Sequence, residues 1–68
     1  MLVDKILAFL EEQPGRVYSG GIEEWCSVLN LDNSAIDDIY RAVREIKSRR
    51  TAAVLKHGNG YLSVRLTD

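Results

Sequence analysis

Hydrophobic residues recur along most of this chain at the three- and four-residue spacing of amphipathic helices. The first such stretch runs over about residues 2–13, and Pro14-Gly15 stops it. Ser19-Gly20-Gly21 opens a second stretch, which ends near Asn30, a residue type that tolerates the left-handed conformation. The apolar stripe of this second stretch consists of Ile22, Trp25, Cys26 and Leu29. Two helices are therefore predicted before residue 31.

A third helix is predicted from the turn at residues 32–34 to Arg49-Arg50. Asp32 is the preferred N-cap of this helix, with Ser34 as its rival. The apolar face consists of Ile36, Ile39, Tyr40, Val43 and Ile46. On the polar face, Arg41 lies four residues from both Asp37 and Glu45, which predicts two ion pairs.

The C-terminal segment changes to the alternating pattern of β-strands. Two strands are predicted, at about 53–56 and 61–66, around His57-Gly58-Asn59-Gly60. Arg16–Ser19 is a further short candidate, read as a lone strand. We expect one core that joins the third helix to the last strand, made of Leu29, Ile36, Ile39, Val43 and Val64.

Length and composition place the chain among ordinary single domains, here residues 1–68. It is 46% hydrophobic and 28% charged, and its single cysteine excludes an internal disulfide. No apolar run approaches the roughly 18 residues of a membrane span. Acidic residues within the first apolar stretch make a poor signal peptide. We expect a cytoplasmic protein with no membrane association.

The net charge of −1 conceals a strong polarity along the chain. Residues 1–38 contain two basic and eight acidic residues, a net charge of −6. Residues 39–68 contain seven basic and two acidic residues, a net charge of +5. Such asymmetry either indicates a charged partner or reflects acids placed early and bases placed late on helices.

The order of elements predicts an α+β fold, a winged helix-turn-helix of three helices with a C-terminal β-hairpin wing. The segment YSGGIEEWCSVLNLDNSAIDDIYRAVREIKSRR, together with GNGYLSV, resembles the N-terminal DNA-binding domain of biotin ligase/repressor proteins. The likeness lies in the Leu29-Asn30-Leu31 turn, the Ala35-Ile36 step and the hairpin. It covers about two-thirds of the chain but not the ligase part, so it implies no ligase activity.

This resemblance implies that the start of the third helix enters the major groove of double-stranded DNA and that the wing flanks it. By position, the groove-facing candidates are Asn33, Ser34, Asp37 and Arg41, and the wing candidates are Lys56, His57 and Asn59. The sequence departs from the family at Asp37 and Asp38, whose charges repel the phosphates. It also lacks the glycine that commonly ends this helix, which predicts a longer approach to the wing.

A second group of basic residues could contact phosphates. These are Arg44, Lys47, Arg49, Arg50 and Lys56. The alternative is an ordinary bias of positive charge toward a helix C-terminus beside a solvated hairpin. Lys56 favours phosphate contact, because it belongs to a different element from the other four.

The sequence offers little for catalysis. Asp37 and Asp38 are adjacent, so on a helix they point about 100° apart. His57 is the only histidine and Cys26 lies on an apolar stripe, so no metal site or cofactor is expected. The leading expectation is a small transcriptional regulator or accessory DNA-binding module. The alternatives are a protein-interaction domain that uses the acidic surface or the apolar face of the first helix, and an excised domain of a larger protein.

Overall fold

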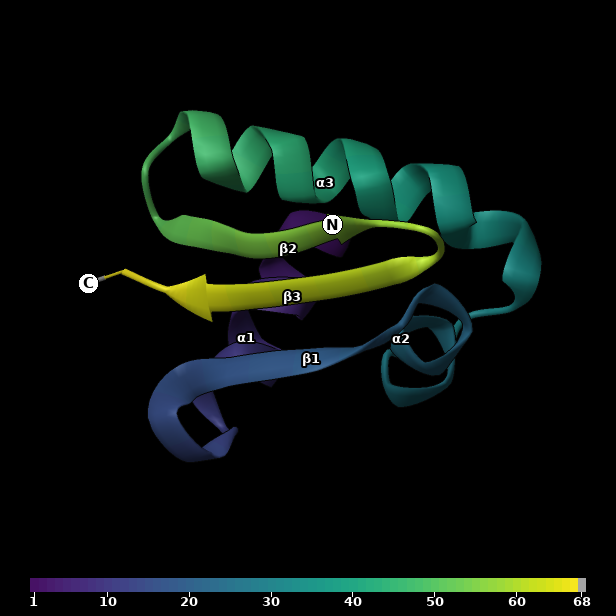
Figure 1. Cartoon of the computed structure of the whole chain (residues 1–68), viewed down its shortest axis with the longest axis horizontal. Helices are drawn as coiled ribbons and strands as arrows, with labels where there is room; N and C mark the ends of the chain where they lie inside the picture. Colours follow the sequence, from purple (N-terminus) through teal and green to yellow (C-terminus); the bar gives the residue numbers. More distant parts are fainter. Residues whose placement is uncertain (68) are drawn as a thin grey trace.

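The computed structural model describes residues 1–67, and its helices and strands form one α+β unit around a small sheet (Figure 1). The elements are α1 (Leu2–Glu11), η1 (Pro14–Arg16), β1 (Val17–Gly21), α2 (Ile22–Val28), η2 (Asn33–Ala35), α3 (Ile36–Ser48), β2 (Ala52–Gly58) and β3 (Tyr61–Leu66). In Figure 1, α3 runs alongside β2, and α1 lies behind the sheet. This arrangement is compatible with the predicted winged-helix topology.

The sheet has three antiparallel strands in the order β1-β3-β2. The prediction of a lone first strand is therefore wrong, because β1 pairs with β3 from Val17 opposite Arg65 to Gly21 opposite Tyr61. Gly20 and Gly21 belong to this strand, and Gly21 is also the N-cap of α2, so the helix begins directly after the segment that the sequence had suggested. The ladder continues to the helix itself, since the Ile22 amide donates to the Gly60 carbonyl at 2.7 Å.

The core joins all the elements around β3. Trp25 is fully buried, and its indole Nε1 donates to the Leu62 carbonyl at 2.9 Å. The predicted core is confirmed for the four residues Leu29, Ile39, Val43 and Val64, which are all buried. Ile36 is only partly buried and packs against the edge of the cluster.

Two helices end on residues in the left-handed conformation. Asn30 follows α2 with a φ of 62°, as predicted, and Arg50 follows α3 with a φ of 61°. The amide of Thr51 then donates to the Ile46 carbonyl at 3.2 Å, which closes the helix end. The expected longer approach is wrong, because Arg50 adopts the conformation that glycine usually supplies and β2 begins at Ala52.

The start of α3 is reached through a 3₁₀ turn. The Asp32 side chain accepts from the Ser34 amide at 2.9 Å, so Asp32 is the cap of η2, and α3 begins at Ile36. The predicted ion pairs of Arg41 are not the ones formed. Arg41 pairs with Asp38 at 3.5 Å, one turn earlier along the same face. This pair is exposed and contributes little to stability.

The hairpin is tighter than the sequence suggests. β2 extends to Gly58, so only Asn59 and Gly60 form the turn, with φ values of 53° and 72°. Two consecutive positive φ angles match the two-residue turns of β-hairpins. Lys56 and His57 consequently lie in β2, where the sequence had placed His57 in the loop. No helix in the described part of the chain is long and apolar enough to cross a membrane.

Candidate functional site

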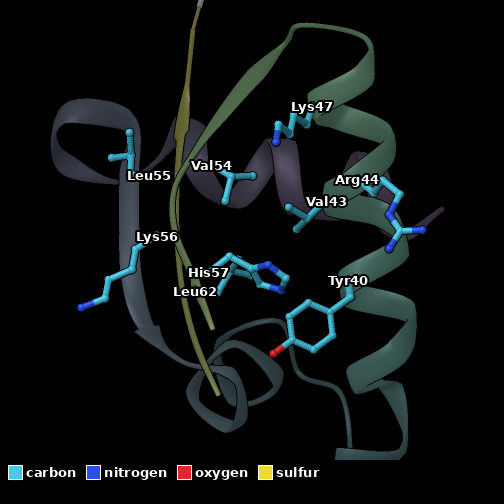
Figure 2. Close-up of a pocket in the computed structure, with 9 residues that line it drawn as sticks. All are labelled: Tyr40, Val43, Arg44, Lys47, Val54, Leu55, Lys56, His57 and Leu62. Carbon is cyan, nitrogen blue, oxygen red and sulfur yellow. The ribbon is translucent and has the colours of Figure 1, made fainter. Parts of the chain in front are cut away.

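A groove with a volume of about 410 Å³ lies between α3 and β2 (Figure 2). Its floor contains the buried side chains of Val43 and Leu62. The residues that line it are Tyr40, Val43, Arg44, Lys47, Val54, Leu55, Lys56, His57 and Leu62. These residues come from α3, β2 and β3, so the groove depends on the packing of the third helix against the sheet.

The α3 wall follows from helix geometry. Tyr40, Arg44 and Lys47 are spaced at i, i+4 and i+7, which places them on one face of the helix. Val43 lies beside this row and turns into the core, where it is 5% exposed. The row therefore presents one aromatic and two cationic side chains along the rim of the groove.

The β2 wall depends on a β-bulge at Leu55. Val54 pairs with Val64 and Lys56 pairs with Ser63, which leaves Leu55 without a partner. In a regular strand, Val54 and His57 would point to opposite faces, because they are three residues apart. With the bulge, both point toward α3, while Leu55 and Lys56 point away (Figure 2). Nothing in the local sequence had indicated this bulge, and the predicted strand missed the position of His57.

Tyr40 and His57 meet across the groove. Their ring centroids are 5.0 Å apart and the rings are inclined at 64°, an edge-to-face contact. Tyr40 is half-buried and His57 is exposed, so this pair is open to solvent on one side. The sequence had placed His57 in the hairpin loop as a wing candidate for DNA contact and had assigned Tyr40 to the apolar face of the third helix.

Positive charge gathers on the helical rim. Arg44 and Lys47 are exposed, and neither forms a salt bridge with a described residue. An adjoining hollow at the opposite end of the row from Lys47 is lined by Asp37, Tyr40, Arg41, Arg44 and His57. The groove thus has a negative group near its aromatic end and two cations toward the other end.

The five predicted phosphate contacts do not share one surface. Arg44 and Lys47 border the groove, whereas the Lys56 ammonium lies 5.2 Å from the centre of the Tyr61 ring on the other side of β2 (Figure 2). Arg49 pairs with Glu45 at 3.2 Å. Arg50 follows the end of α3, and its carbonyl accepts from the Thr67 hydroxyl at 2.8 Å.

The predicted groove-reading residues lie at the other end of α3. Asn33 and Ser34 are exposed in η2, and the Ser34 amide and hydroxyl both donate to Asp32. These bonds hold the pKa of the Asp32 carboxyl below its ordinary value. Arg41 is exposed and paired with Asp38. Asn59 is exposed in the hairpin turn, well separated along the chain from these residues.

Cys26 is a core residue, as predicted. It is 1% exposed, and burial, with smaller contributions from the charges of Asp32 and Glu23, raises the pKa of its thiol. A raised pKa disfavours the reactive thiolate. Residues 1–67 contain no group of three or more His, Cys, Asp or Glu side chains arranged to hold a metal ion.

Comparisons with protein-family models, with curated proteins and with solved structures found no match. The functional argument therefore rests on the geometry and charge of this chain.

Proposed function

We propose that this domain binds double-stranded DNA, as a small transcriptional regulator or an accessory DNA-binding module. The observation that carries the proposal is the pair of exposed cations, Arg44 and Lys47, on one face of α3 with no carboxylate partner among the described residues. Neutralising phosphates is the main source of sequence-independent affinity for DNA. The α+β architecture supports the proposal, because it is compatible with a winged helix-turn-helix that presents its third helix.

The charges along α3 favour contact through its second half. Asp37 and Asp38 occupy the first turn, where their carboxylates oppose a polyanion. Arg41 offsets one of them through its pair with Asp38. Farther along the helix, Arg44 and Lys47 pair with no described carboxylate, so their positive charge is not offset in this way. In this proposal α3 approaches the phosphate backbone with the turns that carry Arg44 and Lys47, and the first turn stays farther away.

The remaining predicted contacts keep secondary roles in this proposal. Asn33, Ser34 and Arg41 supply hydrogen-bonding groups at the helix start, and Asn59 supplies one at the hairpin turn. Arg49, Arg50, Lys56 and His57 are exposed and add positive charge or hydrogen-bond donors on other parts of the surface. Contacts to phosphates position a protein on DNA, whereas sequence is read at base edges, so these residues would mainly set orientation.

The test measures binding of a fluorescein-labelled duplex by anisotropy over a series of salt concentrations. Log affinity falls with log salt by about 0.9 for each phosphate contact. The double variant Arg44→Gln/Lys47→Gln should therefore bind more weakly, with a slope shallower by about 1.8. The matched control, Arg16→Gln/Arg65→Gln, removes the same charge from η1 and from β3 and should leave the slope unchanged.

Two results would count against the proposal. Equal effects of the two double variants would show that only net charge matters and would remove the α3 rim from the interface. Absence of duplex binding by the wild-type protein at low salt would remove DNA as the partner. The protein-interaction alternative would then lead, because Leu55 and Tyr61 expose 53% and 37% of their surfaces on the sheet.

A further inference from the structure

The groove between α3 and β2 contains more than a phosphate-binding rim. We propose that it binds one unpaired nucleobase of a single-stranded nucleic acid, with the base against Tyr40 and His57 and its phosphate on Arg44 and Lys47. This inference rests on the proposed function, since it assumes that the domain binds nucleic acid. It adds a binding site for an unstacked base, which contact with duplex phosphates does not require.

The shape of the groove suits a ligand of this size. Its volume of about 410 Å³ lies within the range of roughly 300–1,000 Å³ that is typical of small-molecule sites. The floor is apolar, from Val43, Val54 and Leu62, and the polar groups lie along the rim. A flat heteroaromatic ring with a charged substituent matches this division between floor and rim.

The aromatic pair supplies the stacking surface. Tyr40 and His57 come from different elements, and in Figure 2 both rings point into the space between α3 and β2. Their edge-to-face contact at 5.0 Å leaves a face of the exposed His57 ring available to a base. Stacking of bases on aromatic side chains tolerates any base, because every base has a π-face.

The distribution of charge orients the ligand. Asp37 lies beside the aromatic end and partly cancels the positive charge of Arg41 there, so a phosphate is attracted less strongly at that end than beside Lys47. Arg44 and Lys47 extend the row one and two turns beyond Tyr40, up to about 10 Å along the helix axis. The lining residues of the groove include the exposed cations Arg44 and Lys47 and no carboxylate, whereas the Lys56 ammonium lies on the other side of β2. The phosphate is therefore assigned to the Lys47 end and the base to the Tyr40 end.

The walls of the groove select an unpaired base. In a duplex the faces of each base are covered by its neighbours in the stack. A ring enclosed between a helix and a strand must have left that stack, as bases do in single-stranded segments and loops. The occupant is therefore a single strand, whereas the outer rim of α3 remains accessible to duplex phosphates.

The experiment compares two fluorescein-labelled single-stranded octanucleotides with the intact protein by anisotropy. One carries normal bases and the other has abasic sites at its central positions, so both carry the same phosphates. The base-containing strand should bind more tightly, by roughly 5- to 150-fold for one stacked base. Their affinity ratio isolates the contribution of the base, because phosphate contacts contribute equally to both.

The variants assign this ratio to the groove. His57→Leu removes one ring from an exposed position and should reduce the ratio severalfold. Tyr61→Leu is the matched control, since it removes an exposed ring that lies beside the Lys56 ammonium and outside the groove lining, and it should leave the ratio unchanged. Circular dichroism and thermal melting of both variants verify that each is folded as the wild type.

The outcomes separate this inference from the proposed function. A ratio near one in the wild type, with duplex still bound through Arg44 and Lys47, would overturn the inference and leave the proposed function intact. Equal loss in His57→Leu and Tyr61→Leu would also overturn it. Binding of a free mononucleotide as tightly as the octanucleotide would show that the ligand is a nucleotide and would overturn the assignment of a single strand. Failure to bind either duplex or single strand would overturn both proposals.

Discussion

The two sides of β3 differ in how completely aromatic side chains fill the space around them. On the β1 side, Phe9, Tyr18 and Trp25 form a closed cluster, with ring centroids 4.9 to 6.1 Å apart. On the β2 side, Tyr40 and His57 form a single pair beside an open groove. The closed side is built for stability, whereas the open side retains side chains that a ligand can contact.

The β1 side and the β2 side also differ in how far their polar groups are exposed to solvent. On the closed side the Trp25 indole donates to the Leu62 carbonyl, and burial, aided by the charge of Glu24, raises the pKa of the Tyr18 hydroxyl. On the open side Arg44 and Lys47 remain exposed to solvent. Both sides share one hydrophobic core, and the difference lies in the exposed cationic and aromatic side chains that only the β2 side places beside a groove.

The sharpest test of this contrast is Trp25→Ala. It removes the centre of the closed cluster and should lower the free energy of unfolding by about 3–5 kcal/mol. A domain is stabilised by only roughly 0.05–0.15 kcal/mol per residue, so this loss would leave much of the protein unfolded. Urea denaturation followed by circular dichroism measures it. A midpoint close to that of the wild type would show that the cluster is not the main source of stability.

The connection between α3 and β2 offers a stabilising change on the open side. Arg50 holds a φ of 61°, a conformation that costs a residue with a Cβ about 1–2 kcal/mol and costs glycine little. Arg50→Gly should therefore raise the free energy of unfolding by about 1 kcal/mol, or the melting temperature by about 4–8 °C. Calorimetry measures the shift. Arg49→Gly is the control and should lower stability, because the φ of Arg49 is −82°.

A smaller effect should appear as a pH dependence at the start of α3. The pKa of Asp32 is lowered from its ordinary 3.8 by its bonds to Ser34, so the charged carboxylate is favoured in the folded state. Its contribution is present above pH 3.8 and is lost as the pH falls through the lower, folded value. The stability difference between wild type and Asp32→Asn should shrink over that range. A constant difference would remove the carboxylate charge from the cap.

The smallest effect is expected for His57→Leu. His57 is exposed and contacts one half-buried ring, so its loss should change the free energy of unfolding by no more than about 0.5 kcal/mol. Urea denaturation beside Trp25→Ala gives the direct comparison. A cost near that of a core substitution would show that the groove is part of the core and not an open site.

The sequence predicted the helices and the last strand because their periodicity depends on burial against one core. Ile39, Val43 and Val64 are buried where the stripes place them. It did not predict that β1 pairs with β3, since residues 17–21 and 61–65 are far apart in the chain and no local pattern encodes their register. The conformation of Arg50 was missed for another reason, because the bond from the Thr51 amide to the Ile46 carbonyl closes the helix end around a residue whose side chain disfavours this geometry.

The candidate site was only partly visible in the sequence. Arg44 and Lys47 were predicted as phosphate contacts and His57 as a wing residue, but the groove that joins them requires α3 to lie against β2. Tyr40 was assigned to the core face of α3, and its periodicity is indeed that of Ile36 and Val43. Tyr40 is half-buried at the rim of the groove, where its ring contacts His57. The β-bulge sets the position of His57.

The unpaired Leu55 has a consequence for how this chain tolerates changes in length. Leu55 is the additional residue in β2. Val54 and His57 therefore point to the same face of the sheet, as two residues separated by one position do in a regular strand. A chain from which Leu55 was deleted would still present His57 to α3 and Lys56 to the opposite face. The groove should therefore tolerate the loss of Leu55, because the pairing of His57 with Leu62 and the face to which His57 points are unchanged.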